Sequence, residues 1–247
     1  MNKMIQSRKS MLASDLDGTL LGDPAALDQF AEWAAGNRDS LLLVYVTGRF
    51  FGSVVEAVRT SSLPDPDAVI AAVGTNIHKY PGGEILKEWH DQVCNHWNAH
   101  TVRQSLENQE SLQLQEEEFQ SEFKVSYYSE NADSRKLEAL LQRVKSAGVD
   151  AEIIYSSNHD LDFLPAGMNK GAAVAFLADR WRGPAGNIIA SGDTGNDRSL
   201  FERGFHGIVV ANAQPELKTI EAPNIYHARS PYARGVLEGI RYWREQK

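Results

Sequence analysis

Two aspartates one residue apart follow the first apolar segment of the chain, in the stretch SDLDGTLLGD that begins at Ser14. If the strand continued through them, Asp15 and Asp17 would point to the same side, because side chains two apart along a strand share a face. Two carboxylates about 4 Å apart repel each other by roughly 4 kcal/mol at an effective dielectric constant of about 20. The pair therefore indicates a bound cation, a proton on one carboxyl group, or both, unless a turn at Gly18 swings one side chain away.

Three further segments carry polar side chains at comparable positions. They are Thr47-Gly48-Arg49, Asn169-Lys170-Gly171, and the stretch GDTGND with Asp193 and Asp197. Two of them follow an apolar segment directly, and the one with Lys170 opens a helical pattern. Because sites in an open parallel sheet form beyond the carboxyl ends of the strands, the segments can converge and bring four carboxylates, a hydroxyl and an ammonium group together.

Phosphoryl transfer through an aspartyl phosphate is the chemistry that uses such a set. One carboxylate attacks phosphorus. A hard divalent cation with oxygen ligands at about 2.0–2.1 Å, for which Mg²⁺ is the first choice, screens this nucleophile from the anionic substrate. A second carboxyl group donates its proton to the leaving alkoxide and then takes one from water. The hydroxyl and the ammonium group hold the phosphate oxygens as the charge moves.

In type and order, the four segments resemble the motifs of the haloacid dehalogenase superfamily of phosphatases. The resemblance implies that Asp15 is the nucleophile and Asp17 the general acid and base. It further implies phosphate or substrate binding by Thr47, Gly48 and Asn169, charge neutralisation by Lys170, and Mg²⁺ binding by Asp15, the backbone carbonyl of Asp17, Asp193 and Asp197, the last directly or through a water.

A narrower resemblance covers nearly the whole chain. The stretches GDTGND with NAQPEL, and SSNHDLDFLP with NKG, are similar to those of the sucrose-6-phosphate phosphatase and mannosylfructose-phosphate phosphatase family. This implies hydrolysis of a phosphorylated disaccharide under an inserted lobe, with sucrose 6-phosphate first and mannosylfructose phosphate as the alternative. The sequence departs from the family at two places: it has Gly74-Thr75-Asn76 where we expect Gly-Thr-Glu or Gly-Ser-Glu, and Asn158-His159 where we expect Gly-Lys. These departures leave the identity of the disaccharide open.

Other functions stay open at this stage. A less selective sugar-phosphate phosphatase or a hexose phosphomutase would use the same residues. A non-catalytic partner of a glycosyltransferase would be expected to lack a carboxylate or Lys170, and all of these are present. An active enzyme could still have, as its partner, the glycosyltransferase that makes its substrate.

The apolar segments predict an α/β core. Continuous apolar strands are expected at SMLASD, LLLVYVTGR, AVIAAVG, NIIASG and GIVVAN, with helical patterns between them. Such strands are typical of a Rossmann-like, doubly wound parallel sheet covered on both faces. Asp23 followed by Pro24 predicts the start of the first helix. We expect this core to span residues 1–80 and 166–247.

The middle of the chain, residues 81–165, is more polar and predicts a smaller inserted α+β cap domain. A helical stretch runs through EWHDQVCNHWNAHTVRQSL, and FKVSYY then alternates two sets of side chains: Phe123, Val125 and Tyr127, and Lys124, Ser126 and Tyr128. This is the pattern of an antiparallel strand with one open face. Because that face can line a cleft, Lys124 and Tyr128 are candidate sugar contacts.

Several polar residues have both a structural and a functional interpretation. Arg49 fits a salt bridge as well as a place in the site, and Asp160 and Asp162 fit structural hydrogen bonds as well as sugar binding. His96 and His100 have the spacing of a metal-binding pair on a helix, but no third ligand or catalytic glutamate lies between them, which favours a solvent-exposed face.

The composition restricts the class of protein. The chain has 247 residues, of which 42% are hydrophobic and 23% charged, as in an ordinary soluble globular protein. Its single cysteine, Cys94, excludes an internal disulfide and indicates a reducing compartment, so we expect a cytoplasmic protein. A net charge of −8 without a basic run argues against a nucleic-acid partner. No apolar stretch is long enough to predict a membrane span.

Overall fold

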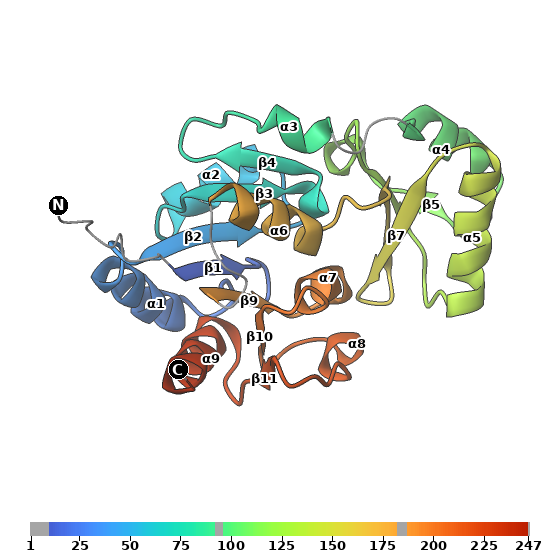
Figure 1. Cartoon of the computed structure of the whole chain (residues 1–247). Coiled ribbons are helices and arrows are strands. Elements are labelled where there is room, and N and C mark those ends of the chain that lie inside the picture. The colour runs from blue at the N-terminus through green and yellow to red at the C-terminus, as the bar shows by residue number, and fades with distance from the viewer. Residues whose placement is uncertain (1–9, 92–95, 182–186, 247) are drawn as a thin grey trace.

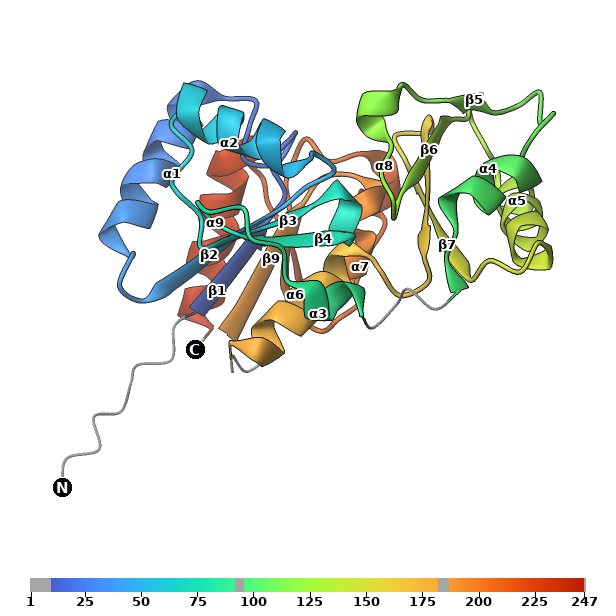
Figure 2. The same cartoon turned by 90° about the horizontal axis from the view of Figure 1, so that it is seen from above.

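The computed structural model describes residues 10–91, 96–181 and 187–246. Within these ranges, Figures 1 and 2 show a larger domain built on a central sheet and a smaller domain beside it. The strands of the larger sheet are β1 (Ser10–Ser14), β2 (Leu41–Val46), β3 (Ala68–Ala71), β4 (Asn76–Lys79), β9 (Ile188–Gly192), β10 (His206–Val209) and β11 (Ile225–His227).

These strands lie in the order β11-β10-β9-β1-β2-β3-β4, and all pairs are parallel except β3 with β4. From β3 to β11 the parallel strands follow the order 3-2-1-4-5-6, which is that of a doubly wound Rossmann sheet. The predicted core architecture is therefore confirmed. The strand order reverses between β1 and β9, and this is where sheets of this kind bind their ligands.

Helices cover both faces of the sheet (Figure 1). One face packs against α1 (Pro24–Gly36), α2 (Phe51–Thr60), α8 (Pro215–Lys218) and α9 (Tyr232–Glu245), the other against α3 (Lys87–His90), α6 (Lys170–Arg180) and α7 (Arg198–Phe201). In β1, Leu12 faces the first group while Met11 and Ala13 face the second. A strand buried on both faces has no polar alternation, which explains the continuous apolar segments.

The start of α1 is as predicted. The Asp23 carboxylate accepts a hydrogen bond from the backbone N–H of Ala26 at 3.1 Å, and Pro24 occupies the first helical position, where no N–H is needed.

The smaller domain is an antiparallel sheet with helices on one face. Its strands, β5 (Gln113–Leu114), β6 (Val125–Tyr128), β7 (Ala151–Ser156) and β8 (Asp160–Pro165), lie in the order β5-β6-β8-β7. Val125, Leu161 and Phe163 pack against α4 (Ala99–Ser105) and α5 (Ser134–Ser146). The short 3₁₀ turns are η1 (Ala72–Gly74), η3 (Glu117–Phe119) and η5 (Gly195–Asp197).

Two details of the predicted small domain are wrong. The strand expected from Phe123 begins at Val125, because residues 122–123 form a turn between the bridged residues Ser121 and Lys124. The Phe123 ring packs on His90 of α3, at 4.5 Å between ring centres. The helical stretch expected through this region is divided between α3 and α4, and Cys94 lies outside the described residues. His96 precedes α4 and His100 lies on it, both exposed, so the two do not share a helix.

The domain boundaries at residues 81 and 165 stay predictions. Leu86 and Trp89 pack with the core cluster under α6, which favours a later passage into the small domain than residue 81. None of the described helices combines the length and the apolar character needed to cross a bilayer.

Candidate active site

Lys170 is the centre of the site. Its side chain is completely buried, and its Nζ donates hydrogen bonds to Asp15 Oδ1 at 2.8 Å, to Asp197 Oδ1 at 2.6 Å and to Asn196 Oδ1 at 2.6 Å. Burial acts to lower the pKa of Lys170, but the carboxylates of Asp15 and Asp197 outweigh this and raise it above its usual value. The lysine is therefore held as a cation beside Asp15.

The first turn of α6 brings Lys170 to this position. Asn169 caps the helix by accepting a hydrogen bond from the N–H of Ala172 at 2.9 Å, and its amide donates to Glu152 Oε1 on β7 at 2.9 Å. Asn169 thus joins the helix start to the small domain. The structure shows it as a cap, and its predicted contact with the phosphate stays a prediction.

Asp15, Asp193 and Asp197 form an all-oxygen cluster, with carboxylate oxygens within 4.8 Å of one another. Asp15 follows β1 and Asp193 follows β9, so the cluster lies at the reversal of the strand order. Burial, with Asp197 and Asp193 adding to it, raises the pKa of Asp15 well above its usual value, although Lys170 opposes this. Burial and then Asp197 raise the pKa of Asp193 to about 7. A hard cation such as Mg²⁺ fits this donor set and would remove the repulsion.

The three carboxylates of this cluster differ in what remains free to bind a metal. Both oxygens of Asp197 accept hydrogen bonds from the protein: Oδ1 accepts from Lys170, and Oδ2 accepts from the N–H groups of Asp193 and Thr194 at 2.9 and 3.2 Å. Asp193 Oδ1 accepts from the Thr19 hydroxyl at 3.0 Å. These contacts favour Asp15 and Asp193 as direct ligands and Asp197 as the residue that positions Lys170.

Asp17 lies apart from the other carboxylates. Its side chain is 55% exposed and forms a bidentate pair with Arg49, whose Nε donates to Asp17 Oδ2 at 2.6 Å. Gly18 makes the separation possible: its φ is +79°, and a Cβ there would lie 2.2 Å from Asp193 Oδ2. The turn thus swings Asp17 towards the cleft, and Arg49 forms the salt bridge that was one of its two interpretations.

The turn after β3 connects the Thr47 segment with the Lys170 segment. Ala72 and Val73 have φ values of 49° and 60°, and their N–H groups donate to the carbonyls of Arg49 and Thr47 at 2.9 and 3.0 Å. A Cβ on Gly74 would lie 2.3 Å from the backbone of Asn169. Strained backbone of this kind concentrates at functional sites, and no pattern in the sequence indicated it.

A cleft of about 660 Å³ separates the two domains above this cluster. Asp15, Asp17, Thr47, Gly48 and Arg49 line its core side. Thr47 is buried, and its Oγ1 accepts a hydrogen bond from the N–H of Arg49 at 3.1 Å. Of the predicted core residues, Asp15, Asp17, Thr47 and Gly48 thus lie on one cleft, whereas Lys170, Asp193 and Asp197 do not line it and adjoin it through Asp15.

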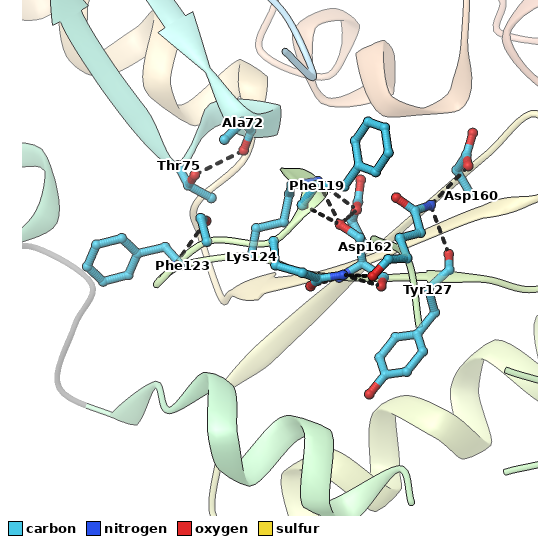
Figure 3. Close-up of polar contacts among 12 residues, drawn as sticks. Ala72, Thr75, Phe119, Phe123, Lys124, Tyr127, Asp160 and Asp162 are labelled. Atoms are coloured by element: carbon cyan, nitrogen blue, oxygen red, sulfur yellow. Dashed lines mark hydrogen bonds and ion pairs between the residues drawn. The ribbon is translucent and has the colours of Figure 1, made fainter. Parts of the chain in front are cut away.

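The small domain contributes Lys124, Tyr128, Asp160 and Asp162 to the cleft. Figure 3 shows Lys124 beside Asp162, with Phe119 close by. Lys124 Nζ donates to Ser126 Oγ at 2.6 Å and to Asp162 Oδ1 at 3.3 Å, so Asp162 neutralises it. Lys124 is only 4% exposed, and this face is therefore not the open, wet face that the alternation suggested.

Two aromatic rings flank this group. The Lys124 ammonium lies 5.8 Å from the centre of the Phe50 ring, which belongs to the core. The Tyr128 hydroxyl donates to Glu116 Oε2 at 3.0 Å, and its ring lies 4.6 Å from His159. Carboxylates, one ammonium group and aromatic rings thus line the part of the cleft beside the small domain.

The family model described as sucrose-6F-phosphate phosphohydrolase matches residues 8–244. The chain belongs to this family. The mannosylfructose-phosphate phosphatase of Agrobacterium fabrum is 33% identical to it over 238 residues, which cover 94% of this chain and 96% of that protein. The chain spans about three fifths of the length of the plant sucrose-phosphatases that it matches.

Solved structures agree with the membership in the sucrose-6F-phosphate phosphohydrolase family. The sucrose-phosphatase of Synechocystis sp. PCC6803, in complex with sucrose and phosphate, has a TM-score of 0.90 and 33% identity over 96% of this chain and 98% of its own. A subclass IIB sugar phosphatase of the haloacid dehalogenase superfamily shares the fold, with a TM-score of 0.69 and 15% identity over 96% of this chain and 98% of its own. The predicted superfamily and family are confirmed.

The family motifs contain three residues for which the sequence analysis assigned no role. Asn196 lies inside GDTGND and contacts Lys170. Asn212 and Glu216 lie inside NAQPEL: the Asn212 amide donates to the Gly18 carbonyl at 2.7 Å, while Glu216 reaches the small domain. These three residues could have been singled out from the sequence because they are polar residues inside motifs that were already recognised.

Proposed function

We propose that this protein is a Mg²⁺-dependent phosphatase that hydrolyses a phosphorylated disaccharide through an aspartyl phosphate, with sucrose 6-phosphate as the first-choice substrate. The observation that carries this is the buried Asp15–Lys170 pair, 2.8 Å apart, at the base of a cleft between the core and a polar cap. Membership in the sucrose-6F-phosphate phosphohydrolase family supports the substrate class.

The residues divide the reaction between them. Asp15 attacks phosphorus, and Lys170 orients this carboxylate and offsets negative charge as the phosphoryl group arrives. Asp15 and Asp193 would hold Mg²⁺, which when bound screens the nucleophile from the phosphate. Thr47 binds a phosphate oxygen, with Gly48 lining the cleft beside it.

Asp17 serves as the general acid and base. Arg49 holds its side chain in the cleft, with the guanidinium Nε 2.6 Å from Asp17 Oδ2. As the general acid, the Asp17 carboxyl group donates its proton to the leaving alkoxide. The same carboxylate then takes a proton from the attacking water.

The cap side of the cleft suits an uncharged, polyhydroxylated leaving group. Three carboxylates line it, from Glu118, Asp160 and Asp162, against the single ammonium of Lys124, which Asp162 already neutralises. Carboxylates accept hydrogen bonds from sugar hydroxyls, and the aromatic rings offer apolar faces. We propose Lys124 and Tyr128 as sugar contacts on this basis.

A panel of esters tests the proposal. Purified protein is assayed for phosphate release from sucrose 6-phosphate, mannosylfructose phosphate and glucose 6-phosphate, with Mg²⁺ and with EDTA. We expect the highest kcat/KM for a disaccharide phosphate and no release in EDTA. Equal rates on all esters would indicate a broader phosphatase. Isomerisation of the hexose phosphate without phosphate release would indicate a mutase. Phosphate release in EDTA would contradict the mechanism. Co-purification with the glycosyltransferase that makes the ester would test that proposed partner.

Mg²⁺ is expected to stabilise the folded protein without any substrate. At about 100 times its Kd, a ligand that binds only the folded state stabilises it by about 2.7 kcal/mol. The melting temperature should therefore rise with Mg²⁺, and Asp193→Asn, which removes a ligand, should suppress the rise. The exposed Asp39→Asn is the control. An unchanged rise in Asp193→Asn would show that Mg²⁺ binds elsewhere.

The Mg²⁺ effect also depends on pH. Without metal, burial and Asp197 raise the pKa of Asp193 to about 7, whereas an aspartate in an unfolded chain titrates at about 3.9. Between these values the folded protein holds more protons than the unfolded chain, so its stability rises as the pH falls. Mg²⁺ has to displace this proton, and its stabilising effect should be larger at about pH 8 than at about pH 5.5.

A second negative charge on the sugar should impair turnover. We expect kcat/KM at least about tenfold lower for the analogue of sucrose 6-phosphate in which the glucose C6 alcohol is a carboxylate, because the cap carboxylates repel it. Asp160→Asn should bring the kcat/KM values of the two esters closer together, whereas Glu138→Gln, at an exposed position on α5, should leave their ratio unchanged. Equal kcat/KM values for the two esters would contradict the charge argument.

A further inference from the structure

The tip of the β7–β8 hairpin lies on the loop of the core that follows β9. The hairpin turns at Ser157 and Asn158, whose φ values are 56° and 53°. Gly195 approaches the hairpin closely: a Cβ there would lie 2.5 Å from the carbonyl oxygen of Tyr155 and 3.4 Å from Ser156. Any larger residue at Gly195 would therefore push the hairpin away.

Glu216 joins the two segments from a third side. It lies in the first turn of α8, and its Oε1 accepts hydrogen bonds from the backbone N–H of Ser157 at 3.0 Å and of Gly195 at 3.3 Å. One carboxylate oxygen thus bonds to the small domain and to the core at once. We call these interactions of Gly195 and Glu216 with residues 155–157 the tip contact.

The tip contact is placed to resist opening of the cleft. β8 runs from Asp160 to Pro165 and leads into α6, so the hairpin turn lies at the end away from this connection. At about 3.3 Å per residue, the strand separates the two ends by about 20 Å. Figure 1 shows the hairpin reaching from the start of α6 to the neighbourhood of α7 and α8. A bond this far from the connection opposes rotation more strongly than one beside it.

The loop in the tip contact is also the loop that holds Lys170. Gly195 begins η5, and the next two residues, Asn196 and Asp197, accept hydrogen bonds from Lys170. Ser157 and Asn196 both line the cleft. The position of the small domain and the cage around Lys170 therefore depend on one short segment.

We propose that Glu216 is a positioning residue that holds the small domain against the core in the closed, substrate-holding arrangement. The inference rests on the proposed function for its kinetic consequences, but the tip contact itself can be measured without turnover. Glu216 does not touch the reacting atoms. It acts through Ser157 on the closure of the cleft and through Gly195 on the loop beside Lys170.

Three variants and a control test the proposal. Glu216→Ala removes the acceptor, and we expect KM for sucrose 6-phosphate to rise about tenfold while kcat stays within about threefold. Glu216→Gln keeps an acceptor oxygen and should restore KM to within about threefold of wild type. Gly195→Ala should act like Glu216→Ala, since Gly195 does not have a positive φ and alanine is opposed there chiefly by contacts across the tip contact. Glu221→Ala, at an exposed position, should leave KM unchanged.

Amide hydrogen exchange gives the readout that needs no substrate. In Glu216→Ala the N–H groups of Ser157 and Gly195 should exchange faster than in wild type, and small-angle scattering should show a larger radius of gyration. Wild-type KM and wild-type exchange in Glu216→Ala would overturn the proposal. A lower melting temperature with unchanged KM would also overturn it, because Glu216 would then only stabilise α8. If the wild type releases no phosphate from any ester, the proposed function fails, while the exchange and scattering data still decide whether the tip contact holds the domains together.

Discussion

Asp15→Asn is expected to abolish phosphate release, with kcat lower by at least about 10⁴-fold, because it removes the nucleophile from an otherwise complete site. An amide oxygen cannot attack phosphorus at a comparable rate, and the other members of the cluster remain in place. Asparagine keeps the volume of the buried side chain and an oxygen facing Lys170, which lies 2.8 Å from Asp15. The melting temperature should therefore change by less than about 4 °C.

Phosphate release under single-turnover conditions, together with a thermal melt, measures both effects. The exposed Asp39→Asn serves as the control for the loss of one carboxylate. If Asp15→Asn kept even about a tenth of the wild-type rate, Asp15 would not be the nucleophile. An acid-stable phosphoenzyme formed by that variant would contradict the assignment as well, since the variant has no carboxylate at this position to carry the phosphoryl group.

Lys170→Met is expected to have the largest effect on stability. The ammonium group is buried among three acceptors, and its loss leaves the carboxylates of Asp15 and Asp197 buried without their counter-charge. Breaking a buried ion pair by removing one partner costs about 3–5 kcal/mol. Phosphate release should also fall by at least about 10³-fold, because no ammonium group then offsets the charge of the arriving phosphoryl group. Mg²⁺ should restore part of the stability and little of the activity.

Chemical denaturation with and without Mg²⁺ measures the loss. Lys124→Met is the matched control, since Lys124 is also buried but faces the single carboxylate of Asp162 in the small domain. Lys124→Met should lower the free energy of unfolding by less than Lys170→Met does, and it should change KM more than kcat. In the Lys170→Met background, Asp197→Asn should recover stability, as expected for directly coupled residues. A metal-free Lys170→Met variant as stable as wild type would show that the buried carboxylates carry no charge.

Much of the fold could be predicted because local patterns report burial. The strands of the core are buried on both faces, so each appears as a continuous apolar run, and Asp23 with Pro24 marks the start of α1. In the small domain the pattern was weaker. Phe123 belonged to an alternating segment, yet its ring packs on His90 of α3, a contact between residues 33 apart that periodicity cannot show.

By itself, the sequence determined the α/β core and the family, and it predicts the set of reacting groups, since these depend on residue types at short spacings and on where apolar runs end. The tertiary structure alone decided how those groups are paired. Asp17 and Asp15 are two residues apart, yet Asp17 bonds to Arg49 and Asp15 to Lys170, because Gly18 turns the chain and distant segments supply the partners. The partners of Glu216 could not be predicted from the sequence for the same reason: hydrogen bonds to backbone N–H groups of other segments form only when the chain has folded.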